Sequence, residues 1–230
     1  MSYLLINPHM PIEMKKSLKN FDIPIVEVHP NDHLPYPLSG HPDLLVHPLP
    51  DGSVIVDPRY YSYYSEQLSD RNIYPGWQEI GNKYPQDTIF NGFAIDGLFV
   101  HQIENTDPQV LDYYKSCHYE LISVKQGYSR CNTLLGQDYI MTSDPSILKA
   151  LKDKIKTYSI HHKHIDLPGY SYGFIGGCSG RIGRRLILSG HFDDHPSSKK
   201  MDAVFKEEKE EIYYLWEKNL LDIGSIFYLE

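Results

Sequence analysis

The chain has 230 residues, 41% of them hydrophobic, and a formal net charge of −8. This charge argues against DNA as a partner, because binding to phosphate backbones usually needs a basic surface. No apolar run approaches the length of a membrane span, and the first residues lack the features of a signal peptide. Three cysteines at irregular spacing indicate reduced thiols rather than a disulfide framework, so we expect a cytoplasmic protein without a membrane partner.

The first repeated feature along the chain is a junction, at which an apolar strand ends and a helix-length segment follows. Asp is a good N-cap because its carboxylate accepts from the free amides of the first turn, and Pro suits the next position because it has no amide to leave unpaired. The chain has five such junctions, roughly 40 to 50 residues apart: Asn7-Pro8, Asp57-Pro58, Asp107-Pro108, Asp144-Pro145 and His195-Pro196. This spacing predicts an array of similar supersecondary units.

A glycine recurs at a nearly constant distance before the junctions. Upstream of each later junction, a glycine opens another extended stretch: Gly40, Gly92, Gly127 and Gly177. Each unit therefore reads as a glycine, a strand, a short turn, a strand, the junction, a helix and a final apolar strand. We expect repeated ββαβ units, with the glycines letting the backbones crowd together around an axis.

The first unit is incomplete, because the chain begins directly at the strand before Pro8. The missing strand is at the other end, where Gly224 opens an extended run with no junction after it. The C-terminal strand is therefore expected to pair with the N-terminal one and leave no open edge. This predicts an α/β fold, a pseudo-fivefold, five-bladed propeller of ββαβ units. We expect a single domain over residues 1–230, because one unit is too small to bury its apolar face.

This architecture resembles the pentein, or guanidino-group-modifying, superfamily of arginine deiminases, dimethylarginine dimethylaminohydrolases and amidinotransferases. The motifs "GHPD", "VKQGYSRCNT" and "PGYSYGFIGGCSG" look closer to a compact bacterial branch of the superfamily than to its enzymes. The resemblance implies a site in the central channel, where the enzymes use a cysteine thiolate, a histidine and carboxylates. These types suit the chemistry, because a thiolate is a strong nucleophile and carboxylates pair with guanidinium.

Residues just after each glycine are the candidates for the channel. We expect Cys178, or alternatively Cys131, as the nucleophile, with His41 as the base and Asp43 as the carboxylate that either orients this base or holds a cationic ligand. The candidates for ligand contacts are Asn91, Ser129, Arg130, Ser179 and Asp222. His41 and Asp43 would face the same way on an extended strand, whereas Arg130 and Cys131 would point to opposite faces.

The sequence departs from the family in two places. The family nucleophile belongs on the closing strand, where this chain has Ser225, and the family histidine belongs to the fourth unit, where "GYSRCN" has none. The alternative for both buried cysteines is simple packing. Tyr170 and Tyr172 are expected either to wall the channel mouth over Cys178 or to pack between units.

Two further motifs are candidates for binding sites. In "SIHHKHID", His162 and His164 would share one face of a strand, but no third ligand is indicated, so we expect no metal. "GGCSGRIG" lacks the lysine of a phosphate-binding loop and precedes a strand, so we expect no nucleotide and no other cofactor.

Two functions remain open. The first is a protein that binds a small guanidino or other planar cationic ligand in the channel, with cysteine-dependent amidino hydrolysis or transfer as its chemistry if it is an enzyme. The second is a non-catalytic scaffold for a protein or ribonucleoprotein partner.

Overall fold

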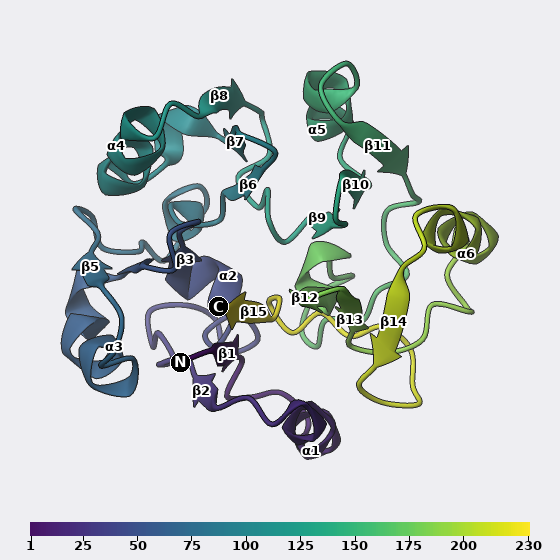
Figure 1. The fold of residues 1–230 in the computed structure, drawn as a ribbon, viewed down its shortest axis with the longest axis horizontal. Helices are drawn as coiled ribbons and strands as arrows, with labels where there is room; N and C mark the ends of the chain where they lie inside the picture. Colours follow the sequence, from purple (N-terminus) through teal and green to yellow (C-terminus); the bar gives the residue numbers. More distant parts are fainter.

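The computed structural model describes residues 1–230 and consists of five three-stranded sheets around a hub (Figure 1). The first unit has β1 (Tyr3–Ile6), α1 (Ile12–Leu18), β2 (Ile25–Glu27) and β15 (Phe227–Leu229). The second has α2 (Pro42–Leu45), β3 (Val46–Pro48), β4 (Val54–Val56), α3 (Tyr61–Gln67) and β5 (Ile73–Pro75). The third has β6 (Phe93–Ile95), β7 (Leu98–His101), α4 (Pro108–Ser116) and β8 (Glu120–Ser123).

The last two units follow the same order. The fourth has β9 (Thr133–Leu135), β10 (Tyr139–Thr142), α5 (Pro145–Leu151) and β11 (Lys156–Ser159). The fifth has β12 (Ser179–Ile182), β13 (Arg185–Leu188), α6 (Ser198–Glu207) and β14 (Glu211–Tyr214). In every sheet the middle strand runs antiparallel to the inner strand and parallel to the outer one, which it reaches through the helix. No helix of the structure has both the length and the apolar composition to cross a membrane.

The two chain ends close the ring. β15 pairs antiparallel with β1, so that Tyr3 lies opposite Leu229. Arg71 of the second unit donates to the main-chain oxygens of Met1 and Glu230 and thereby holds both ends. The predicted fold class and its closure by the terminal strands are confirmed.

All five junctions have the same capping geometry. In each, a side-chain atom of the first residue accepts the backbone N–H two residues later, which satisfies an amide at the turn into the helical segment. The capping pairs are Asn7 with His9 (2.8 Å), Asp57 with Arg59 (2.9 Å), Asp107 with Gln109 (2.9 Å), Asp144 with Ser146 (2.8 Å) and His195 with Ser197 (3.0 Å). His195 uses Nδ1, so an imidazole replaces the carboxylate without loss of the contact.

The segments that follow the glycines begin with a turn, and the strand starts only after it. His41 occupies the N-cap position of the single turn of α2, without a side-chain capping bond; this turn contains Asp43, and β3 begins only at Val46. The expectation that His41 and Asp43 alternate on a strand is therefore wrong, because Pro42 at the first helical position favours a helix. In the same way, Cys178 lies in a 3₁₀ turn (Gly176–Cys178) and Cys131 in the turn before β9.

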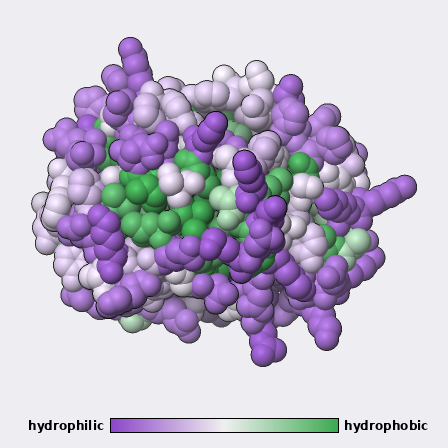
Figure 2. All heavy atoms as spheres, turned by 90° about the horizontal axis from the view of Figure 1, so that it is seen from above, coloured by the Kyte–Doolittle hydropathy of each residue, from purple (hydrophilic) through white to green (hydrophobic).

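Hydrophilic side chains cover most of the face seen in Figure 2, and apolar atoms gather in its middle. Inside, the middle strands supply much of the apolar core. β4 and β10 are buried along their whole length, as is β7. The sheets thus bury their centres against the helices, while the inner strands keep the polar residues that precede them close to the hub.

Candidate functional site

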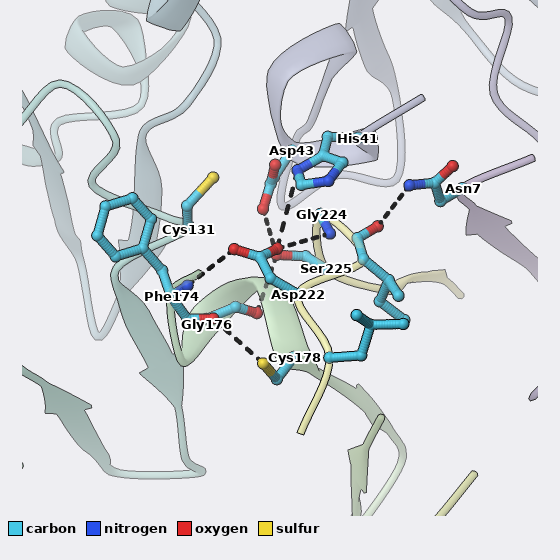
Figure 3. Close-up of polar contacts among 12 residues, drawn as sticks. Asn7, His41, Asp43, Cys131, Phe174, Gly176, Cys178, Asp222, Gly224 and Ser225 are labelled. Carbon is cyan, nitrogen blue, oxygen red and sulfur yellow. Dashed lines mark hydrogen bonds and ion pairs between the residues drawn. The ribbon is translucent and has the colours of Figure 1, made fainter. Parts of the chain in front are cut away.

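A cavity of about 250 Å³ lies where the inner strands begin. Three chemically active side chains from three separated segments line it: His41, Cys131 and Asp222. Its remaining wall is mostly apolar and aromatic, with Tyr128, Tyr170, Tyr172 and Phe174 among its residues. The cavity is called the acidic cavity below, because Asp222 lies in its wall. A second carboxyl group, Asp43, is not part of the wall but lies next to His41 (Figure 3).

Asp222 is fixed by the main chain. Its Oδ2 accepts from Phe174 N at 2.8 Å and its Oδ1 accepts from Gly224 N at 3.0 Å (Figure 3). Burial raises the pKa of Asp222 to about 6, although both hydrogen bonds lower it. A Cβ at Gly177 would overlap this carboxylate, so glycine is required there for the close approach.

His41 separates the acidic cavity from a smaller one of about 130 Å³. Its Nδ1 is buried without a hydrogen-bond partner and lies 3.8 Å from Asp222 Oδ1. Burial lowers the pKa of His41, and the nearby Asp43 only partly opposes this, so the ring is neutral near pH 7. The side chain therefore retains unused hydrogen-bonding capacity beside a carboxylate.

Asp43 is held by Ser225 of the segment that precedes β15. Ser225 Oγ lies 2.6 Å from Asp43 Oδ2 and 3.0 Å from the carbonyl oxygen of Gly176 (Figure 3). A hydroxyl has one hydrogen, so both contacts are hydrogen bonds only when Asp43 itself carries a proton. Burial raises the pKa of Asp43 in the same direction, and its Oδ1 has no partner.

Cys131 is the thiol that borders the acidic cavity. Asn91 positions it, because Asn91 Nδ2 donates to Cys131 Sγ at 3.1 Å and to the Asp43 carbonyl at 2.7 Å. Asn91 Oδ1 also accepts the amides of Arg130 and Cys131, which fixes their turn. Burial, followed by the charges of Asp43 and Asp222, raises the pKa of Cys131, so it is a neutral thiol when the cavity is empty.

Cys178, the first candidate for the nucleophile, lies outside the acidic cavity. Its side chain is fully buried among apolar residues, and its Sγ donates to the Phe174 carbonyl at 3.3 Å. Burial raises the pKa of Cys178 as well. Of the two candidate cysteines, only Cys131 therefore reaches the cavity that His41 lines.

The other candidate ligand contacts lie elsewhere. Ser129 donates to the Gln126 carbonyl and Ser179 to the Gly176 carbonyl, so both hydroxyls support turns. Arg130 lines a different, larger cavity of about 420 Å³. Arg130 and Cys131 do point to different places, as the alternation argument expected, although they lie in a turn and not on a strand.

Tyr170 and Tyr172 wall the cavity beside Cys131, and not over Cys178. His162 and His164 follow β11 in an exposed turn, where His164 has a positive φ of 63°, so they do not share the face of a strand. Five wall residues are not identified by the sequence: Leu38, Leu44, Leu167, Ser171 and Phe174. Phe174 had a sequence signal, because it continues the alternating aromatics of "YSYGF".

A closed ring of five ββαβ units with polar side chains gathered at its hub is the pentein fold, and solved structures agree. DDAH from Pseudomonas aeruginosa, a mutant in complex with citrulline, is similar with a TM-score of 0.57, 10% identity, and coverage of 92% of this chain and 91% of that one. The chain itself belongs to the family of unknown function DUF6873, whose family model matches residues 5–227.

Two further solved structures have the same fold. The agmatine deiminase of C. jejuni is similar with a TM-score of 0.54, 9% identity, and coverage of 93% of this chain and 87% of that one. SxtG, an amidinotransferase from Microseira wollei, is similar with a TM-score of 0.53, 11% identity, and coverage of 96% and 93%. Among curated proteins, none matches significantly.

Proposed function

We propose that the acidic cavity binds a small planar cation that carries a guanidino or amidino group. One observation carries this proposal: the Asp222 carboxyl group is buried in the cavity wall, and no lysine or arginine nitrogen lies within salt-bridge distance of it. A buried carboxylate without a cation is costly, so a cationic ligand would supply the missing charge.

The shape and lining of the cavity support a flat ligand. A volume of about 250 Å³ suits a small molecule, and the aromatic rings of Tyr128, Tyr172 and Phe174 offer faces for a planar cation. Asp222 keeps further lone pairs on both oxygens, which a guanidinium can reach with two parallel N–H groups. The names of two structural neighbours, agmatine deiminase and amidinotransferase, state guanidino chemistry of the same kind.

Calorimetric titration with agmatine, arginine and creatine at pH 8 tests the proposal. We expect at least one of them to bind, and the Asp222→Asn variant to weaken it about 100-fold, because a buried charge pair loses one partner. Asp96→Asn removes an exposed carboxylate outside the acidic cavity and serves as the matched control, with unchanged affinity. If no cation of the panel raises the melting temperature of the wild-type protein, the proposal is wrong.

A second candidate function, amidino hydrolysis, is favoured by the presence of Cys131 and His41 on one cavity. A bound cation would offset the carboxylates that raise the pKa of Cys131 and so increase its thiolate fraction. The thiol proton passes to His41, Sγ forms a bond to the guanidinium carbon, and the C–N bond breaks as the amine leaves with that proton. Water then attacks the same carbon, the C–S bond breaks, and the thiol is restored.

The Cys131→Ser variant separates binding from turnover. We expect it to bind agmatine within a few-fold of the wild type, while the release of ammonia or amine from the bound guanidino group is lost. Cys178→Ser is the matched control and keeps whatever turnover the wild type has. Wild-type protein that binds a cation without any release of product would limit the function to binding.

A further inference from the structure

A second cavity, of about 420 Å³, runs along the inner strands beyond the acidic cavity. Each of the five units contributes to its wall, through Pro48 of β3, Phe93 of β6, Leu135 of β9, Gly180 of β12 and Phe227 of β15. More than half of its lining residues are hydrophobic. The hub of the ring therefore has two separate cavities with different linings.

Arg130 is the distinctive residue of this second cavity. Its side chain is 95% buried, and Nη1 donates to the carbonyls of Thr133 at 2.9 Å and Gly176 at 3.3 Å. Nε and Nη2 make no hydrogen bond, yet they are not among the enclosed atoms, so they open into the cavity. No carboxylate lies within salt-bridge distance, although the charge of Asp43 acts on the guanidinium from farther away, and the Phe227 ring lies 5.7 Å from it.

The other polar residues of the second cavity have their partners. Arg181 Nη1 lies 2.8 Å from both carboxylate oxygens of Glu210, which compensates its charge. His47 uses both ring nitrogens, with Phe90 and Tyr114. Asp96 is exposed at a turn with a φ of 47°. Arg130 is thus the one buried charge of this cavity without a salt-bridge partner.

We propose that this cavity is a second small-molecule site, and that it takes an organic carboxylate with a flat apolar body. The free edge of the Arg130 guanidinium presents two N–H groups, which match the two oxygens of a carboxylate. The rings of Phe93 and Phe227 provide apolar surface for the rest of the ligand. The volume is within the range of ordinary ligand pockets.

This site is independent of the acidic cavity, and a failure of one proposal leaves the other standing. Hydrogen bonds link the two sites, from Asp43 through Ser225 (Figure 3) and the Gly176 carbonyl to Arg130. Asn91 is a second link, because it contacts both Cys131 and the Arg130 amide. An anion beside Arg130 and a cation beside Asp222 would occupy different spaces. One molecule of the protein can therefore hold both.

The test uses benzoate as the probe and benzamide, its neutral counterpart of similar shape, as the comparison. We expect benzoate to bind the wild-type protein at least about tenfold more tightly than benzamide, measured by calorimetry. The Arg130→Gln variant should lose this preference, whereas Arg185→Gln, which removes an exposed and paired arginine, should retain it. Equal binding of the two probes by the wild type, or an unchanged benzoate affinity in Arg130→Gln, would overturn the proposal.

If Arg130→Gln does not fold, a second variant tests the same site. Ile95→Trp fills the cavity from its half-buried wall and leaves Arg130 in place. We expect this variant to lose benzoate binding at least about tenfold while its agmatine response is the same as in the wild type. Unchanged benzoate binding in Ile95→Trp would place the benzoate elsewhere and contradict the proposed site.

Discussion

The two cavities of the hub each have a buried histidine, and the two histidines differ in what their nitrogens contact. His47, in the Arg130 cavity, uses both nitrogens within the fold, whereas His41, in the acidic cavity, has a buried Nδ1 without a partner. The charged groups differ in sign as well, with Asp222 on one side and Arg130 on the other. Burial alone therefore does not identify a functional group. A buried donor or acceptor that the fold leaves without a partner does.

The largest effect is expected from filling the space beside Asp222. In Gly177→Val, the new side chain overlaps the Asp222 carboxylate and forces the hub apart, so we expect a loss of about 3 kcal/mol or more in the free energy of unfolding. Agmatine binding should also be lost in Gly177→Val. Urea denaturation and thermal shift measure the two effects.

Gly183→Ala is the control for that experiment. Gly183 has open space around it but a φ of +59°, so its substitution strains the backbone without any overlap. We expect a loss of about 1 kcal/mol in stability and normal agmatine binding. Equal losses in the two variants would mean that Asp222 does not depend on the space at Gly177.

Removing each histidine ring in turn tests the difference between His47 and His41. His47→Ala leaves two buried partners without hydrogen bonds, so we expect it to cost about 3 kcal/mol of stability at pH 7.5. His41→Ala should cost less than half of this and should weaken agmatine binding instead. If the losses of stability are reversed, the assignment of His47 as structural and His41 as part of the site is wrong.

His47 also determines the direction in which its contribution to the free energy of unfolding changes with pH. Burial lowers its pKa to about 4, whereas the unfolded chain begins to protonate at its ordinary value near 6.5. Its contribution is therefore complete above pH 6.5 and is lost as the pH falls towards 4, by about 3 kcal/mol. Unfolding free energies at pH 7.5 and pH 5 should differ less in His47→Ala than in the wild type.

The pH dependence of binding separates the two cavities. Because the pKa of Asp222 is raised to about 6, a cation must displace a proton below that pH and meets a ready carboxylate above it. We expect agmatine affinity to rise about tenfold from pH 5 to pH 7 and then to level off. Benzoate affinity should stay flat over this range, because Arg130 remains charged. Parallel profiles for the two probes would contradict separate sites.

The smallest effect is a difference in cysteine labelling. Cys117 is exposed, Cys131 borders the acidic cavity and Cys178 is enclosed, so we expect iodoacetamide to modify them in that order in the empty protein. The gap between Cys131 and Cys178 should be a few-fold, since burial raises the pKa of both. Mass spectrometry of a time course at pH 7.5 measures the three rates. Faster labelling of Cys178 than of Cys131 would reverse their placement.

The sequence predicts the ring because local signals repeat in it. Each junction is a short-range capping motif, and its five copies keep step with the glycines, so the repeat is visible without any long-range contact. The unmatched glycine at position 224 then places the last strand beside the first. These features depend on neighbouring residues, which is why the pattern of the fold can be read from the chain.

The site was predicted less well because it depends on contacts between units. That Cys131 and not Cys178 borders the cavity follows from the packing of the segment 167–174, which no local pattern specifies. The helical turn at Asp43 had a signal, Pro42 directly after a capping position, that points to a helix start. The role of Asn91, which ties two turns together, has no signal at all in its own neighbourhood.

The closing strand has a consequence for how the protein is made. Asp222 and Ser225 belong to the same terminal segment as β15, so the acidic cavity and the ring are completed by the same stretch of chain. A ribosome synthesises this stretch after the strands and helices of all five units that precede it in the chain. Until then β1 has a partner on one side only, and a nascent chain has neither a closed ring nor an assembled cavity. Binding of a ligand there would therefore report a chain whose synthesis has passed β15.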